Sequence, residues 1–227
     1  MIFVEVVYEG KTKIVLKSND EWFLEFKDSV TGDDSGNIDS GGNRVVDELE
    51  GKAEATAKTA THFFQMVNEE DVSTHFVELS SPTRIQIIPT ERIPLEVIYR
   101  KSAYGSFLSR YGDYVDPMEE LNLIEFNLKD DELGDPLLTE ESVIRLKIAS
   151  TEDIQQMKRI TREVANLIQS DLGEHGLDLI DMKLEFGRSD GGLRVVDEIS
   201  GDTMRVRDLE TGQMLNQIEL AERLELT

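Results

Sequence analysis

Alternating apolar and polar residues predict antiparallel strands over the first part of the chain. Turn residues such as Glu9-Gly10 and Ser18-Asn19-Asp20 separate the short runs, as expected between neighbouring strands of one sheet. The apolar period lengthens to three or four residues at positions 52–68, which predicts a helix with one buried face. The predicted strands cover residues 3–8, 11–16, 22–27, 75–79 and 84–88. We therefore expect residues 1–90 to form a first lobe, with antiparallel strands and one helix.

The remaining residues, 91–227, predict a second lobe that mixes helices and strands. Pro89 and Pro94 bracket a connector, where we place the boundary between the lobes because proline interrupts regular structure. The predicted elements are a strand at 95–101, a short helix at 106–111, a long amphipathic helix from 150 to 173 and a terminal helix within 209–227.

Two alternating runs in the second lobe predict a β-hairpin that carries charged residues. We expect Gly187 to face Leu193 across the Gly-rich turn between the runs. Lys183 then pairs with Asp197, and Glu185 lies on the same face of the hairpin. The opposite face is apolar and consists of Leu184, Phe186 and Val196. Two carboxylates beside a lysine suit Mg²⁺ and a bound phosphate, and a solvated hairpin face is the alternative interpretation.

Basic residues gather at two further places. Lys11 and Lys13 follow a glycine turn and project from one face of a predicted strand. Two ammonium groups there could hold nucleotide phosphates, and a pair of exposed surface lysines is the alternative. Arg100 ends a predicted strand and Ser106 is placed to cap the short helix after Gly105, which together suit a phosphate group. An ordinary serine cap with surface arginines is the other interpretation.

Composition narrows the class of protein. The formal net charge of −23 argues against binding to nucleic acids or anionic membranes, which call for basic patches. We find neither a long apolar run nor a signal peptide, and we expect a soluble protein of the cytoplasm, with the acidic surface serving solubility. With no cysteine and three scattered histidines, any metal should be bound by oxygen.

Five motifs occur in an order that is found in one enzyme family. The match covers roughly residues 5–208. The motifs read Tyr8-Glu9-Gly10-Lys11-Thr12-Lys13, Pro94-Leu95-Glu96-Val97 leading to Arg100 and Gly105-Ser106, Asp135-Pro136-Leu137, Asp181-Met182-Lys183-Leu184-Glu185-Phe186-Gly187, and Asp197-Glu198-Ile199-Ser200-Gly201-Asp202-Thr203-Met204-Arg205. In these motifs the chain resembles the SAICAR synthetases, the phosphoribosylaminoimidazole-succinocarboxamide synthases of purine biosynthesis. Five ordered motifs are far more specific than any one of them.

The resemblance implies an α+β, SAICAR-synthetase-like fold, with an antiparallel-sheet nucleotide lobe, an ATP-grasp-like second lobe and the active site in the cleft between them. It implies a ligase that uses ATP and Mg²⁺. The implied reaction condenses CAIR, 5-amino-1-(5-phosphoribosyl)imidazole-4-carboxylate, with L-aspartate to give SAICAR, ADP and phosphate through an acyl phosphate. The family is generally homo-oligomeric, so a homodimer is expected.

The resemblance also assigns ligands to individual residues. Those assigned to ATP are Lys11, Lys13, Glu91, Ile93 and Lys183, with the connector from Glu91 to Ile93 meeting adenine through its backbone. Those assigned to the ribotide 5′-phosphate are Arg100, Ser106 and Arg205, and those assigned to Mg²⁺ are Glu185 and Asp197. Lys183, among the reacting carboxylate and phosphates, and Lys13 are the expected catalytic residues.

Other interpretations remain open at this point. The chain has Gly201 where the family usually has proline, Arg207 in place of tryptophan, and Thr56 and Ala57 in place of two asparagines. Another Mg²⁺- and ATP-dependent kinase or carboxylate–amine ligase is a second reading, and a non-catalytic nucleotide-binding regulator is a third. The joint presence of the lysines and the metal carboxylates disfavours the regulator. The polar loop at residues 31–43 is either a lid over the substrates or a surface loop.

Overall fold

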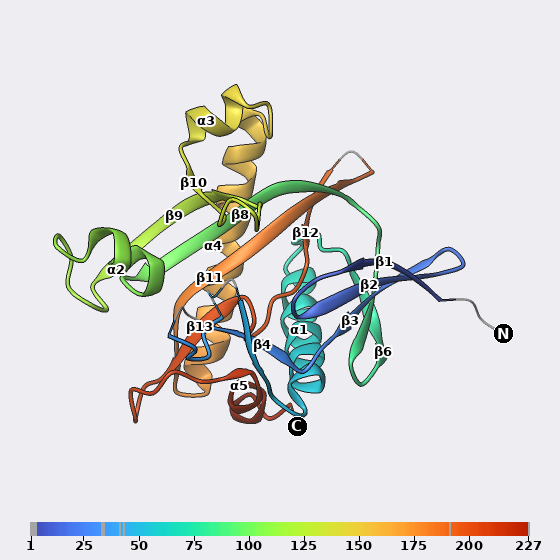
Figure 1. Ribbon diagram of the computed structural model, residues 1–227, viewed down its shortest axis with the longest axis horizontal. Coiled ribbons are helices and arrows are strands. Elements are labelled where there is room, and N and C mark those ends of the chain that lie inside the picture. The colour runs from blue at the N-terminus through green and yellow to red at the C-terminus, as the bar shows by residue number, and fades with distance from the viewer. Residues whose placement is uncertain (1–3, 33–34, 41, 43, 191, 227) are drawn as a thin grey trace. The chain divides into compact units, whose positions relative to one another are not determined.

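The computed structural model describes residues 4–32, 35–40, 42, 44–190 and 192–226, and its elements are labelled in Figure 1. The chain divides into two compact units. The first comprises Met1–Thr90, Glu198–Thr203 and Leu215–Thr227, and the second comprises Glu91–Asp197 and Met204–Met214. Each unit has an antiparallel sheet of its own.

The boundary after Thr90 coincides with the predicted one, but residues 91–227 do not all belong to the second unit. Two C-terminal segments return to the first unit. They do so because Asp202 forms an ion pair with Lys52, and because helix α5 (Gln217–Arg223) packs against helix α1. The sequence pattern could not predict that these segments belong to the first unit, since this depends on tertiary contacts.

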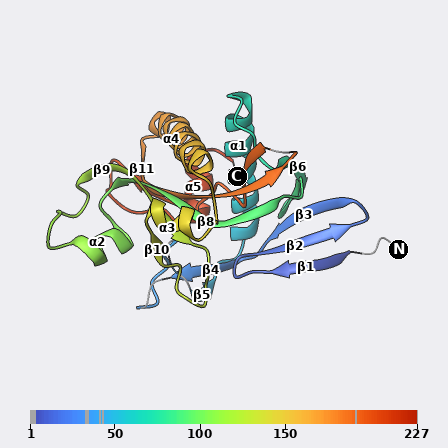
Figure 2. The same ribbon diagram turned by 90° about the horizontal axis from the view of Figure 1, so that it is seen from above.

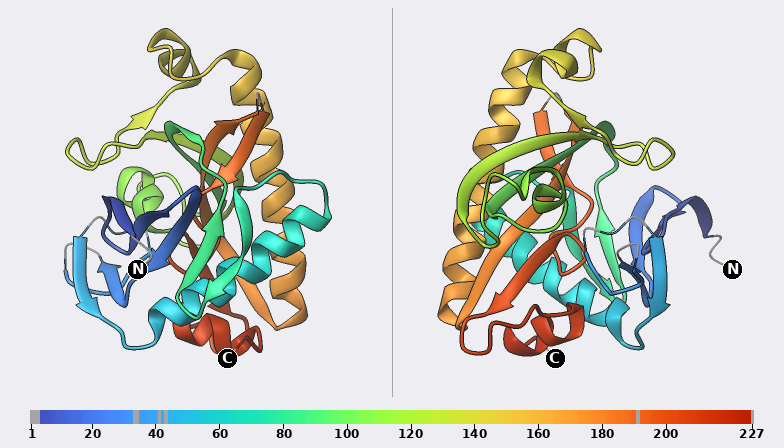
Figure 3. Two further views of the ribbon diagram at one scale, coloured as in Figure 1. Left: turned by 90° about the vertical axis from the view of Figure 1, so that its right-hand side faces the viewer. Right: turned by 60° about the vertical axis from the view of Figure 1, so that its left-hand side comes forward.

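The first unit is built on a five-stranded sheet in the order β1-β2-β3-β7-β6. Its strands are β1 (Glu5–Glu9), β2 (Lys13–Ser18), β3 (Glu21–Phe26), β7 (Arg84–Ile87) and β6 (Phe76–Ser81). Helix α1 (Lys52–Glu69) packs against β3, β6 and β7, and the ring of Phe64 stacks on that of Phe76 at 5.5 Å between centroids. Helix α5 lies against α1, as Figure 3 shows.

The second unit is built on a six-stranded sheet in the order β10-β9-β8-β11-β12, with β13 beside β11. Its strands are β8 (Glu91–Ser102), β9 (Glu120–Leu128), β10 (Leu137–Leu138), β11 (Leu177–Ser189), β12 (Gly192–Val196) and β13 (Met204–Asp208). Its helices are α2 (Gly105–Tyr111), α3 (Glu140–Arg145) and α4 (Thr151–Glu174). Among the described residues, no helix combines the length and the apolar character that crossing a membrane requires.

Strand alternation gives this second sheet one apolar face and one charged face. Leu184 faces Val97 on the apolar side, and both are 0% exposed. Helix α4 packs on β8 and β11, as Figure 2 shows, through a stripe that includes Ile154 and Met157. Glu185 faces Glu96 on the other side. The predicted separation of charged and apolar residues along β11 is therefore correct.

The hairpin register differs from the predicted one by a single residue. Gly187 pairs with Arg194 and Glu185 with Val196, whereas Gly187 was expected opposite Leu193. Ser189 and Gly192 also pair, so the turn is shorter than the Gly-rich composition indicated. Gly191 lies outside the described residues. Val196, expected on the apolar face, consequently shares a face with Glu185.

Pairing along one edge of β11 is interrupted at Lys183. Strand β13 pairs with β11 from Leu177 to Met182, and β12 pairs with it from Glu185 onward. Between β12 and β13 the chain leaves this sheet for residues 197–203. Lys183 is therefore held by the ladder to β8 on the other edge, where it faces Ile98.

The predicted connector before residue 95 is not a connector in the structure. Glu91 and Ile93 belong to the 12-residue strand β8, which pairs with β11 through Phe186 and Arg188. Pro94 is tolerated because the ladder shifts register between Glu185 and Phe186, so that no regular hydrogen bond is needed from its nitrogen.

Other elements were not predicted. Two short strands, β4 (Ser29–Gly32) and β5 (Arg44–Glu48), flank the polar loop expected at residues 31–43. Positions 33–34, 41 and 43 of that loop lie outside the described residues. Strands β9, β10 and β13 and helix α3 were also missed, although β9 alternates clearly enough to be recognised.

We predict that Asp153→Ala destabilises the protein by about 1–2 kcal/mol at pH 7. Asp153 closes the capping box of α4 by accepting from Ser150 N at 2.9 Å, and it pairs with both terminal nitrogens of Arg188 at 2.9 and 2.7 Å. These hydrogen bonds from the Arg188 guanidinium lower the pKa of Asp153 below its ordinary value, against an opposing effect of burial.

A lowered native pKa stabilises the fold above the unfolded-state value of about 3.9, and this contribution is lost as the pH falls toward the native pKa. Urea unfolding should therefore show a constant difference between variant and parent from pH 7 to about pH 5, and a shrinking one below about pH 4. Glu152→Ala, in the same exposed helical turn, is the control. An equal difference at every pH would contradict the role of the charge.

Candidate active site

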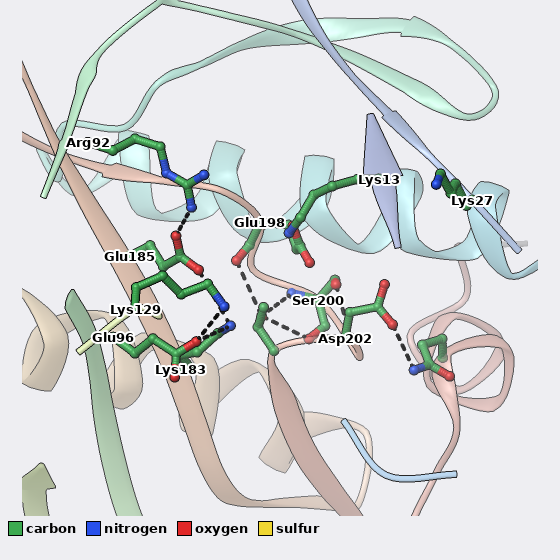
Figure 4. A network of polar contacts seen from close by, with 12 residues as sticks. Lys13, Lys27, Arg92, Glu96, Lys129, Lys183, Glu185, Glu198, Ser200 and Asp202 are labelled. Atoms are coloured by element: carbon green, nitrogen blue, oxygen red, sulfur yellow. Dashed lines mark hydrogen bonds and ion pairs between the residues drawn. The ribbon is translucent and has the colours of Figure 1, made fainter. Parts of the chain in front are cut away.

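A cluster of lysines and carboxylates occupies the charged face of the second sheet, beside the interruption in β11. We call it the carboxylate–lysine cluster. Its members are Arg92, Glu96, Lys129, Lys183, Glu185 and Asp197, and Figure 4 shows how the first five lie. Strands β8 and β11 supply most of these residues, because alternate positions of neighbouring strands project from one face.

Glu96 is the centre of the cluster. Its Oε1 accepts hydrogen bonds from the ammonium groups of Lys183 and Lys129, each at 3.0 Å. Lys183 Nζ also lies 3.5 Å from Glu185 Oε1, and Arg92 forms an ion pair with the other oxygen of Glu185. The side chains of Glu96 and Glu185 are 8% and 3% exposed, so each negative charge is compensated almost out of contact with water.

The pKa values of this cluster reflect its charges. Burial alone would raise the pKa of Glu96, but Lys183 and Lys129 outweigh it and hold the pKa below its ordinary value. Burial alone would lower the pKa of Lys183, but Glu96, Glu185 and Asp197 raise it well above its ordinary value. The pKa of Lys129 is likewise raised, since two carboxylates outweigh burial and repulsion from Lys183. Both lysines are therefore cations at neutral pH.

Asp197 belongs to this cluster although strand alternation would place its side chain on the opposite face of the sheet. With the observed register, a continued β12 would turn Asp197 to the apolar face. The strand ends at Val196 instead, and Asp197 has a left-handed backbone with φ 72°. Its carboxylate is buried and close enough to contribute to the raised pKa of Lys183. Aspartate tolerates this backbone better than most residues do.

The donor chemistry of the cluster suits a divalent cation of the Mg²⁺ kind. Glu185 and Asp197 offer only oxygen, which hard cations prefer, and Mg²⁺ usually takes one or two carboxylates and completes its shell with phosphates and water. No group of three or more candidate ligands gathers around one point in the described part of the chain. Two carboxylates without a dedicated cage are what a metal that arrives with a nucleotide requires.

A second cluster on the same sheet gathers arginines around two buried carboxylates, and we call it the arginine cradle. Its members are Arg100, Ser106, Arg110, Glu125, Asp181 and Arg205. Arg100 donates to Asp181 at 2.9 Å and to Ser106 Oγ at 2.9 Å, and Arg205 donates to the same oxygen of Asp181 at 2.7 Å. The three residues predicted to hold a phosphate are thus brought together.

Glu125 and Gly105 complete the cradle. Glu125 accepts from Arg100 Nε at 3.0 Å and from Arg110 Nη2 at 2.5 and 2.6 Å. Gly105 has φ 50°, and a methyl group there would lie 2.9 Å from Arg205 Nη2, so glycine is what allows the guanidinium to approach. Ser106 does not cap α2 as expected, because the helix begins one residue earlier and its N-cap is Tyr104.

The first unit contains the two predicted nucleotide lysines. Lys13 begins β2, and its ammonium forms an ion pair with Glu198, whose side chain is 1% exposed (Figure 4). The glycine turn is present, since Gly10 N donates to Lys13 O at 2.9 Å. Lys11 precedes the strand, and its carbonyl accepts from Ser29 Oγ at 2.6 Å. The strand was expected to begin at Lys11, so the prediction that both lysines project from one strand is wrong for Lys11. The sequence also gave no sign of Glu198 as a partner of Lys13.

Several residues of these clusters were not selected from the sequence. Glu96, Asp181 and Glu198 stand inside the quoted motifs, so the motifs were a usable signal for them. Lys129 and Arg92 stand outside the motifs, and only the ladder between neighbouring strands brings them to Glu96 and Glu185.

Two clusters of cationic side chains on one sheet face, each organised by buried carboxylates, are typical of enzymes that bind phosphorylated small molecules. Comparison with known proteins gives the family. The sequence model of the SAICAR synthetase family matches residues 6–220, and the chain belongs to that family.

Individual relatives and solved structures support the same family membership. The chain is 36% identical over 215 residues to the phosphoribosylaminoimidazole-succinocarboxamide synthase of Persephonella marina, covering 94% of this chain and 87% of that protein. It is similar to the crystal structure of the Ehrlichia chaffeensis synthase, with a TM-score of 0.89, 25% identity and coverage of 98% and 99%. A solved SAICAR synthetase in complex with ADP gives a TM-score of 0.86 at 29% identity, with 97% of both chains covered. These likenesses confirm the resemblance and the α+β fold class.

We predict that Glu96→Gln lowers the pKa of Lys183. The amide keeps the shape and an oxygen acceptor but removes one of the three charges that raise this pKa. The pKa of Lys183 can be followed by NMR titration of ¹³C-labelled lysine, with Glu141→Gln on the exposed face of α3 as the control. An unchanged Lys183 pKa in the Glu96 variant would show that the charges of the cluster do not act on this lysine.

Proposed function

We propose that this chain catalyses the ATP-dependent condensation of CAIR with L-aspartate, the SAICAR synthetase reaction, at the charged face of the second sheet. Family membership supports the reaction. The observation that carries the assignment of the site is that one sheet face holds both the arginine cradle and the carboxylate–lysine cluster. The cradle suits the 5′-phosphate of the ribotide, and the cluster suits its carboxylate and the phosphates of ATP.

The chemistry needs positioning and charge neutralisation more than a protein nucleophile. A carboxylate is a poor acyl donor, so its oxygen first takes the γ-phosphoryl group of ATP and ADP leaves. The aspartate amine then attacks the acyl carbon, inorganic phosphate leaves, and the amine loses a proton. Phosphoryl transfer of this kind is accelerated by fixed cations around the moving charge. Lys183, held protonated by three carboxylates, supplies such a cation.

For the nucleotide, we assign Lys11 and Lys13 to the phosphates of ATP. The backbone of Glu91 and Ile93 is assigned to adenine. Its support is that β9 pairs with β8 only from Leu95 onward, which leaves one backbone edge of the preceding residues without a ladder partner among the described strands. Such an edge can exchange hydrogen bonds with a planar base.

For the metal, we assign Glu185 and Asp197. Bound Mg²⁺ would neutralise negative charge on the nucleotide phosphates. Arg92 now pairs with Glu185, and its side chain is 48% exposed, so it can leave this carboxylate without losing a buried environment. Asp197 and Glu185 lie near Lys183, so metal and lysine would contact the same phosphate chain.

For the ribotide, we assign the 5′-phosphate to Arg100, Ser106 and Arg205. Asp181 holds both guanidinium groups and so fixes the direction of their remaining N–H donors. We further propose that the enzyme works in the cytoplasm as a homodimer without nucleic-acid or membrane partners. The net charge of −23 supports the absence of anionic polymers, and the exposed apolar side chains of edge strand β1, including Val6 and Tyr8, support self-association.

The function predicts that ADP is released only when both substrates are present. A coupled ADP-release assay with ATP and Mg²⁺ should show turnover with CAIR and L-aspartate together. It should show none, beyond a slow background, when L-aspartate is omitted or replaced by another amino acid. Turnover with an unrelated acceptor in place of CAIR would indicate a different kinase or ligase. ADP binding without turnover under any of these conditions would indicate a nucleotide-binding regulator.

We expect Asp197→Asn to reduce kcat more than tenfold, which corresponds to about 1.4 kcal/mol of lost transition-state stabilisation. Asparagine also accepts a left-handed backbone, so the substitution removes the charge without straining φ. Activity should be measured across a Mg²⁺ titration. Asp190→Asn, at another left-handed aspartate with φ 51°, is the matched control and should change nothing. A variant that keeps parental activity at every Mg²⁺ concentration would rule out the metal role.

A further inference from the structure

The lysine at the start of α1 is buried without contact with water. The side chain of Lys52 is 0% exposed, and its ammonium forms an ion pair with Asp202, whose side chain is 3% exposed. Lys52 Nζ also donates to Lys27 O at 3.2 Å. A lysine in such surroundings is costly unless its charge is paired, so the chain keeps a charged pair where an apolar one would fit.

Stability alone is a weak reason to keep such a pair. Breaking a buried ion pair by removing one partner destabilises a protein strongly, but replacing both partners by apolar residues of similar size is often neutral or favourable. What a buried pair does well is fix the position of one segment against another. Here the segment that it fixes is residues 198–203, which we call the return loop and which belongs to the first unit together with Lys52.

The return loop transmits the position of Asp202 to Glu198. Ser200 Oγ accepts from Asp202 N at 3.1 Å, and Thr203 Oγ1 accepts from Ser200 N at 3.2 Å. The Thr203 hydroxyl is shared as a donor between the carbonyls of Glu198 and Ser200, each 3.2 Å from Oγ1. The carboxylate of Glu198 then pairs with the ammonium of Lys13. A continuous set of short polar contacts therefore leads from the buried pair to a nucleotide lysine.

Helix α5 holds the return loop from a second direction. Gln217 Nε2 donates to Asp202 Oδ1 at 2.9 Å, so the two carboxylate oxygens of Asp202 have different partners. Gly201 makes this possible, because a methyl group at that position would lie 3.0 Å from both Cα and Cγ of Gln217. The helix thus approaches the loop as closely as it does because residue 201 has no side chain.

We propose that Lys52 and Gln217 are positioning residues for Lys13. They clamp Asp202 from two elements, α1 and α5, and thereby set the place of Glu198. Glu198 in turn fixes the direction of the Lys13 ammonium before ATP arrives. The proposal rests on the assignment of Lys13 to the ATP phosphates, and it gives the C-terminal helix a part in nucleotide binding.

The first test compares two ligands. Lys52→Met should raise the dissociation constant for Mg²⁺-ADP at least tenfold, measured by calorimetry at a temperature where the variant is folded by circular dichroism. The dissociation constant for CAIR, which the arginine cradle of the second unit would bind, should change less than twofold. An unchanged affinity for ADP, or an equal loss for both ligands, would overturn the proposal. If the parent binds ADP but not CAIR, the proposed function fails while the ADP comparison still decides the role of Lys52.

A double substitution separates the effect of the ion pair on the position of the return loop from its effect on the stability of the protein. Lys52→Met combined with Asp202→Leu removes both buried charges, so the thermal midpoint should return most of the way to the parental value. The affinity for Mg²⁺-ADP should stay weak, because an apolar contact does not hold the return loop in one place. Recovery of ADP affinity together with stability would show that the pair has only a structural role.

A double-mutant cycle with Glu198 tests whether Lys52 acts on Lys13 through Glu198. In a Glu198→Gln background the link to Lys13 is already weakened, so Lys52→Met should lower ADP affinity less than twofold further while still lowering the thermal midpoint. Additive losses of affinity would mean that Lys52 does not act through Glu198. Gln217→Leu should weaken ADP binding about threefold or more, measured at a temperature where the variant is folded, and Glu222→Ala on the exposed side of α5 is its control.

Discussion

The charged face of the second unit depends on one interruption in strand pairing. Strand β13 pairs with β11 as far as Met182, and β12 pairs with it from Glu185 onward. Between the end of β12 and the start of β13, the chain leaves the sheet. A continuous strand in that place would present backbone and alternating side chains to Lys183. The gap instead ends β12 at Val196 and lets Asp197 turn back in a left-handed conformation toward the lysine. The charge balance around Lys183 therefore follows from where two strands stop.

The same interruption also supplies residues 198–203 to the first unit. Residues 198–203 leave the second sheet at this point and belong to the first unit, where Asp202 pairs with the buried Lys52 and accepts a hydrogen bond from Gln217. A buried cation and a buried anion are each costly alone, so moving this loop away from Lys52 would cost free energy. Asp197, which acts on Lys183 in the second unit, and Glu198, which pairs with Lys13 in the first, are therefore consecutive residues of the chain.

Sequence patterns predicted the parts of the site that depend on local rules. The period of two along β11 placed Lys183 and Glu185 on one face whatever the register. The family resemblance grouped Arg100, Ser106 and Arg205, but it did not select the carboxylates of Glu125 and Asp181 that hold the arginines. The register itself was wrong by one residue, because a turn rich in glycine allows more than one pairing. That the site retains Asp197 depends on a φ of 72°, which no periodicity encodes. Lys129 and the return of α5 to α1 depend on tertiary contacts and were invisible for that reason.

Strand β11 also sets the distance between the arginine cradle and the carboxylate–lysine cluster. Asp181 and Glu185 stand four residues apart on one face, and an extended backbone of this length spans about 13 Å between their Cα atoms. Asp181 organises the arginines that suit a phosphate, and Glu185 belongs to the cluster that suits an activated carboxylate. A substrate that engages both must carry these two groups at a matching separation. If the two clusters bind the two ends of the ribotide, as proposed above, selectivity for the length of the substrate would follow from the spacing of two residues along one strand.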